Sequence, residues 1–75
     1  MNKKRREQIR LIITQLQSCA NELEFTKDEE DESRENMPEN LQHSDAYQHS
    51  EDCSDILMDA VESINDTIND LEGIT

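Results

Sequence analysis

A seven-residue repeat of apolar side chains near the start of the chain is the strongest constraint on the fold. The repeat has intervals of 4, 3, 4 and 3 residues and consists of Ile9, Ile13, Leu16, Ala20 and Leu23. This spacing is typical of an amphipathic helix that buries one face against another helix. It predicts a helix over about residues 3–24, roughly 33 Å long at 1.5 Å rise per residue.

The composition leaves helices as the main structural element. The 75 residues include one Gly, one Pro, no Trp and two aromatic residues, Phe25 and Tyr47. Sandwiches and barrels need far more turn residues and β-forming aromatics. The longest apolar run is Leu11-Ile12-Ile13, too short for a membrane span or a signal peptide. We therefore expect an all-α, cytoplasmic protein without membrane association.

A second apolar face lies near the end of the chain and predicts a second helix. Its residues are Cys53, Ile56, Leu57, Ala60, Val61, Ile64, Ile68 and Leu71. Gly73 followed by Ile74 resembles a Schellman stop. The face is wider than one neighbouring helix covers, and 75 residues bury little surface alone. We therefore expect residues 1–75 to form a single antiparallel helical hairpin that assembles into a homo-oligomeric helical bundle.

The segment between the two faces is harder to interpret. Residues 27–35 contain six acids and no apolar residue, so we expect 25–35 to be a solvated acidic connector. Glu and Arg are also good helix formers, so a helix stays possible. Asn36 has the form of an N-cap, with Pro38 in the first turn and Glu39 at the third position. Ser44 offers a second cap, so residues 37–43 are either a separate short helix or the first turns of one running over about 37–72.

The net charge of −12 is unevenly distributed. Residues 1–10 carry five bases and Glu7, or +4, whereas residues 11–75 carry two bases and 18 acids, or −16. Such an acidic body disfavours nucleic-acid binding, because phosphate neutralisation dominates that affinity. In a hairpin the basic start lies beside the acidic end of the last helix, which predicts ion pairs there that set the helix polarity. Alternatively Arg5 and Arg6 stay unpaired and hold a phosphate or carboxylate.

The cysteines and histidines give no strong site. Cys19 and Cys53 are expected to be buried free thiols near each other across the hairpin. His43, His49 and Cys53 do not complete a tetrahedral metal site within one chain. No nucleophile–base set, phosphate loop or carboxylate pair is recognisable, so we expect a non-enzymatic protein with no cofactor and no metal.

Several features together resemble a family of small acidic helical proteins encoded by phages and prophages of Firmicutes. They are the Lys-Arg-Arg start, the isoleucine- and leucine-rich helix, the acidic connector, the stretch Asn36-Met37-Pro38-Glu39-Asn40-Leu41-Gln42-x-Ser44 and the acidic last helix. The resemblance covers essentially the whole chain, and that stretch is its most specific part. Residues 46–49 depart from the more heavily charged pattern of the family.

The resemblance implies a phage accessory protein that inhibits bacterial immunity. Some small phage proteins sequester nucleotide-type signals between protomers, and others cover a defence protein directly. On the first implication, Asn36, Glu39 and Gln42 contact a base or ribose, and Arg5 and Arg6 of another protomer supply charge. The competing interpretation of Asn36 and Glu39 is helix capping, and of Gln42 plain exposure. Expected partners are therefore the chain itself and either a small phosphorylated ligand or a host defence protein.

Overall fold

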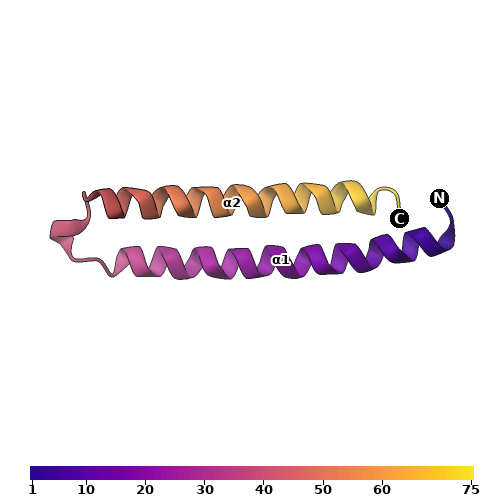
Figure 1. The fold of residues 1–75 in the computed structure, drawn as a ribbon, viewed down its shortest axis with the longest axis horizontal. Helices are drawn as coiled ribbons and strands as arrows, with labels where there is room; N and C mark the ends of the chain where they lie inside the picture. Colours follow the sequence, from indigo (N-terminus) through magenta and orange to yellow (C-terminus); the bar gives the residue numbers. More distant parts are fainter.

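The computed structural model of the chain describes residues 1–75 as an antiparallel hairpin of two long helices. The elements are helix α1 (Lys3–Glu35), a 3₁₀ turn η1 (Glu39–Leu41) and helix α2 (Asp45–Glu72). The two helices lie side by side and both termini are at one end (Figure 1). The molecule is a rod with extents of 59 × 14 × 12 Å. The predicted all-α helical hairpin is confirmed. Neither helix has the apolar length that crossing a bilayer requires.

Helix α1 is longer than the sequence pattern predicts. The backbone N–H of Arg5 donates to the Asn2 side chain at 2.9 Å, which caps the first turn. The predicted end near residue 24 is wrong, and the expected connector 25–35 is the last third of α1. No Gly or Pro interrupts this segment, and its Glu and Arg residues favour helix. The helix stops only before Pro38, because proline disfavours helical backbone at the residue preceding it.

The connection between the helices shows which of the two predicted N-caps begins a helix. Asn36 is the C-cap of α1, so its predicted role as an N-cap is wrong. The N-cap of α2 is Ser44, whose hydroxyl accepts from the backbone N–H of Tyr47 at 3.2 Å. Residues 37–43 are therefore a separate short element around η1 rather than the first turns of α2. A single hydroxyl at position 44 thus sets the start of the second helix.

Helix α2 ends without the expected Schellman motif. Gly73 is the C-cap, but its φ of −65° and ψ of −18° are right-handed helical values. A Schellman motif needs a left-handed residue after the helix, so this prediction is wrong. The last turn instead continues through hydrogen bonds from Ile74 N to Leu71 O and from Thr75 N to Glu72 O.

The core is a single strip between the helices, which we call the seam. The predicted repeat of α1 lies along it, with Ile13 and Ala20 buried. The buried apolar residues of α2 are Val61 and Ile68. The half-buried seam neighbours are Ile9, Leu16, Leu23, Leu57, Ile64 and Leu71. Helix α1 covers only the seam strip of α2. The rest of the wider apolar face predicted for α2 is therefore exposed, and Ile56 is 66% exposed.

We expect Ile13→Ala to lower the free energy of unfolding by about 2–5 kcal/mol, because it removes a buried side chain from the seam. Leu11→Ala is the matched control on the same helix, since Leu11 is 67% exposed. It should change stability by less than about 0.5 kcal/mol. Urea unfolding followed by circular dichroism measures both values. Equal losses for the two variants would contradict this assignment of the seam.

Candidate functional site

The seam changes from apolar to polar in the half near the connection. Beyond Leu23 the spacing of α1 continues at intervals of 4 and 7 with Lys27 and Arg34. Across from them α2 presents Ser50 and Ser54, which are buried. These residues together with Asp31 form what we call the polar cluster. It joins the two helices where no apolar side chain is buried.

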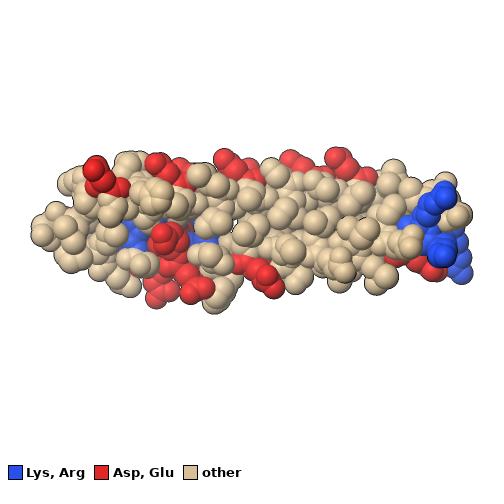
Figure 2. All heavy atoms as spheres, in the orientation of Figure 1, with Lys and Arg blue, Asp and Glu red and all other residues tan.

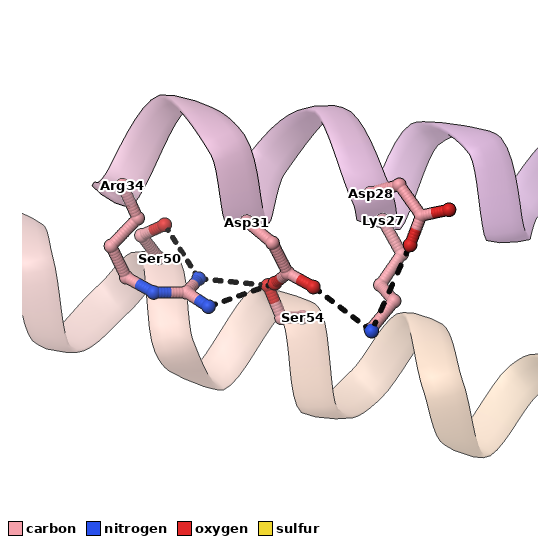
Figure 3. A network of polar contacts seen from close by, with 6 residues as sticks. All are labelled: Lys27, Asp28, Asp31, Arg34, Ser50 and Ser54. Carbon is pink, nitrogen blue, oxygen red and sulfur yellow. Dashed lines mark hydrogen bonds and ion pairs between the residues drawn. The ribbon is translucent and has the colours of Figure 1, made fainter. Parts of the chain in front are cut away.

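The polar cluster is a closed hydrogen-bond network centred on Asp31 and Arg34 (Figure 3). Arg34 donates to the Ser50 hydroxyl at 3.1 Å and the Ser54 hydroxyl at 2.9 Å. Its other terminal nitrogen lies 2.8 Å from Asp31 Oδ1. Ser54 donates to that same oxygen at 2.7 Å, and Lys27 Nζ lies 2.9 Å from Asp31 Oδ2. Both carboxylate oxygens of Asp31 are therefore occupied.

The charges of the cluster stabilise one another. The pKa of the Asp31 carboxyl lies well below its ordinary value of 3.8, because Lys27 hydrogen-bonds to it, with further bonds from Ser54 and Arg34. The pKa values of Lys27 and Arg34 are raised, in both cases mainly by their hydrogen bonds to Asp31. No buried side-chain nitrogen or oxygen lacks a partner. A network with every group satisfied holds the helices in register and has no free group for a ligand.

The apolar pattern of the sequence does not reveal this cluster, but another signal does. Lys27 and Arg34 are the only bases after residue 10. Both occupy positions that continue the apolar repeat, so they face α2 rather than solvent. Two isolated bases in register with a helix seam predict an interhelical polar network.

The predicted ligand-binding residues lie at opposite ends of the rod. Arg5 and Arg6 are exposed near the termini. Asn36, Glu39 and Gln42 lie at the connection, with Asn36 and Glu39 exposed and Gln42 half-buried. The rod is 59 Å long, so the two groups do not form one site within a single chain.

The basic end does not form the ion pairs expected from the sequence. It lies beside the end of α2, where Figure 2 shows a group of basic atoms. The one side-chain hydrogen bond that joins the two ends runs from Arg10 to the main-chain oxygen of Thr75, just beyond α2, at 3.1 Å. All three ion pairs of the molecule involve Lys27 or Arg34. The prediction of ion pairs between the basic start and the acidic end of α2 is therefore wrong, because Arg10 bonds to the main chain of Thr75 and the side chains of residues 3–6 are exposed.

The cysteines are free but are not paired across the hairpin. Cys19 is exposed and Cys53 is half-buried, so the expected burial is wrong for Cys19. Ser54 bonds to Asp31, twelve residues after Cys19, so the two thiols are offset by about 18 Å along the rod. Cys53 Sγ lies 3.5 Å from His49 Nε2. One chain has no group of three side chains that could hold a metal ion.

Two shallow hollows mark the surface. One of about 280 Å³ lies at the connection and is lined by Gln42, His43, Ser44, Tyr47, Gln48 and Glu51. The other, of about 390 Å³, lies between the helices and is lined by Thr26, Glu29, Glu30, Cys53 and Leu57. Gln42 is the only predicted ligand-binding residue that lines a hollow. Tyr47 lines the same hollow and supplies an aromatic ring on which a planar group can stack.

Comparison with protein-family models, curated proteins and solved structures finds no significant match to this chain. Functional conclusions therefore rest on the geometry and charge of the hairpin itself. Those features are the closed polar cluster, the unpaired basic end, the hollow at the connection and the acidic surface of α2.

We expect Asp31→Asn to lower the melting temperature at neutral pH, because it removes the negative charge and one of the two acceptor oxygens to which Lys27, Arg34 and Ser54 bind. Asp28→Asn is the matched control, since Asp28 is 69% exposed and its only ion pair, with Lys27, is 3.9 Å long. A carboxyl with a depressed pKa contributes stability above its ordinary value of 3.8 and loses it as pH falls through the lowered value.

The stability difference between the wild type and Asp31→Asn should therefore shrink as pH falls below about 4. Thermal unfolding from neutral to strongly acidic pH measures this difference. A gap that stays constant with pH, or an equal effect of Asp28→Asn, would show that Asp31 does not link the helices.

Proposed function

We propose that this protein acts by binding rather than by catalysis, as a phage-type inhibitor whose α2 surface covers a basic surface of a host defence protein. The observation that carries the proposal is the charge of α2. Its 28 residues contain nine acids and no lysine or arginine. Acidic atoms follow the outer edge of this helix in Figure 2.

The acids of α2 include a regular row. Aspartates recur every seven residues on the side away from the seam, and all four are exposed: Asp45, Asp52, Asp59 and Asp66. No acid of α2 takes part in an ion pair within the chain. A straight, rigid row of unpaired carboxylates suits an extended basic groove, and its field accelerates encounter with a basic partner.

The test replaces three of these aspartates: Asp52→Asn, Asp59→Asn and Asp66→Asn. The matched control neutralises three exposed acids of α1, Glu7→Gln, Glu22→Gln and Glu24→Gln, so both variants gain the same charge. We expect the α2 variant to bind the host partner roughly tenfold more weakly at low salt, because steering by its row is lost. The control should keep most of the affinity.

The partner is first isolated from host lysate with the wild-type chain at low salt, and affinities are then measured with the purified partner at low and high salt. Wild-type binding should weaken as salt rises, because exposed charges are screened. An acidic partner, salt-independent binding, or equal losses in the two variants would refute the proposal.

A second candidate function is sequestration of a small nucleotide-type ligand, and the hollow at the connection favours it. Gln42 supplies an amide there and Tyr47 an aromatic ring. The hollow also contains Glu51 and no base, so a phosphate would need cations from elsewhere. Arg5 and Arg6 are unpaired within the chain and supply them only from another copy.

Calorimetric titration with cyclic and ADP-ribose-type nucleotides tests this second function. We expect binding that is lost in Gln42→Ala and in Arg5→Ala with Arg6→Ala, and retained in the control Gln15→Ala on exposed α1 surface. No binding by the wild type, or binding unaffected by these changes, would exclude it.

A further inference from the structure

The single hairpin exposes more surface than a globular monomer of its size. Its accessible area is 5731 Å² for a mass of 8.7 kDa. A typical monomer of that mass exposes about 4,700 Å². The excess of about 1,000 Å² is similar to the roughly 800 Å² that each partner buries in a stable interface. The excess exposed area of the hairpin is therefore large enough to form an interface with one further molecule of comparable size.

The charge of α1 indicates what that molecule is. Residues 3–10 carry +4, from five bases and Glu7, and residues 28–35 carry −5, from six acids and Arg34. This order opposes the helix macrodipole at both ends. Within one chain the basic end forms no ion pair with α2, and only Arg10 reaches across, to the Thr75 main-chain oxygen. A second α1 placed antiparallel would compensate both ends at once.

One long side of the hairpin lacks charged side chains over most of its length, and we call it the uncharged face. On each helix it is the row of residues flanking the seam. Thr26 and Cys53 line the same hollow, which places the two rows on one side of the molecule. Ile12 is 46% exposed and Ile74 51% exposed there. The rows are Arg5, Ile12, Cys19, Thr26 and Ser33 on α1, and Ala46, Cys53, Ala60, Thr67 and Ile74 on α2, so Arg5 is their one charged residue, and Glu29 and Glu30 border the face at the hollow.

The opposite flank of the seam is unlike this face. Its α1 row contains Lys3, Arg10, Glu24 and Asp31, and its α2 row contains Glu51 and Glu72. Interface cores are depleted in charged residues. The uncharged face is therefore the side of the hairpin that suits burial by a partner.

We propose that a second copy of this chain packs antiparallel on the uncharged face, with α1 against α1. A two-fold interface of this kind brings each residue next to the equivalent residues of the other copy. Cys19 is the midpoint of α1 (Lys3–Glu35) and lies on the two-fold axis. The basic residues 3–10 of each copy then lie over the acidic residues 28–35 of the other.

Charge repulsion disfavours the alternative parallel arrangement of the two copies. It would place the connection ends together, and residues 28–52 carry ten acids and one base, or −9, in each copy. Like charges brought together at an interface cost several kcal/mol. The antiparallel arrangement separates these ends by the length of the rod.

The antiparallel dimer also bears on the second candidate function. It brings Arg5 and Arg6 of one copy to the end of α1 where Asn36 of the other copy lies, with the Gln42 hollow beyond it. The two groups of predicted site residues, separated within a chain, then meet at each end of the dimer. The observations that support the dimer are the exposed surface area and the charge pattern of α1. They do not depend on either proposed function.

The native cysteines provide the test of orientation. In the Cys53→Ser chain only Cys19 remains, and a short thiol cross-linker should join two chains into a covalent dimer. The control chain carries Cys19→Ser, Cys53→Ser and Ser33→Cys, which moves the thiol fourteen residues along the same row. Equivalent thiols would then be about 42 Å apart, so cross-linking should drop to background. A monofunctional maleimide verifies that both thiols are accessible.

Sedimentation equilibrium gives the mass and the contribution of charge. We expect a dimer for the wild type, and dissociation for Arg5→Glu with Arg6→Glu. Mixing that variant with Glu29→Lys and Glu32→Lys chains should restore a heterodimer. A monomeric wild type, no cross-link through Cys19, or equal cross-linking through position 33 overturns the proposal. Mass and cross-linking do not depend on ligand or partner binding. A failure of the dimer proposal can therefore be distinguished from a failure of either proposed function.

Discussion

The pairing of two helices along one narrow seam is the constraint on which the rest of the structure depends. Each helix has only the other helix as a neighbour. The side chains of this single strip therefore supply most of the burial that stabilises the folded chain. The apolar half of this strip, around Ile13, Ala20, Val61 and Ile68, supplies the burial. Most side chains outside the seam are exposed, which explains why so much of the sequence is free to be charged.

The polar half of the seam gives specificity rather than burial. A repeat of apolar residues alone would let the helices slide by one heptad, because each layer resembles the next. The hydrogen bonds of Arg34 and Asp31 to Ser50 and Ser54 form in one register only, since a shift by one heptad removes the two hydroxyls from the partly buried charges of α1. The cluster therefore fixes which residues meet, and with them the length of the connection at residues 36–44.

The charges divide into two classes by their surroundings. Asp31 and Arg34 are used within the fold, whereas the basic end and the acids of α2 are not. Exposed charges contribute little to the stability of a single chain. The basic end and the acidic row of α2 are therefore the parts of the molecule available for partners, one toward a second copy and the other toward a basic protein.

Much of the fold was predictable from local signals. The seven-residue repeat from Ile9 to Leu23, the scarcity of glycine and proline, and the apolar spacing around Val61 are enough to indicate two amphipathic helices in a hairpin. The boundaries of the helices were less predictable. The acidic segment 25–35 has neither an apolar residue to bury nor a helix breaker, and only its packing through Lys27 and Arg34 shows that it is helix.

The amino-acid sequence by itself determined which residues are charged, which are apolar and where a helix can begin, because these follow from side-chain chemistry and local backbone preference. Only the tertiary structure decided that Asn36 ends a helix, that Ser44 begins one, and that Arg5 and Gln42 lie at opposite ends of a rod. The physical reason is that helix pairing aligns residues far apart in the chain. Which charges are then neutralised and which face outward is a property of that alignment.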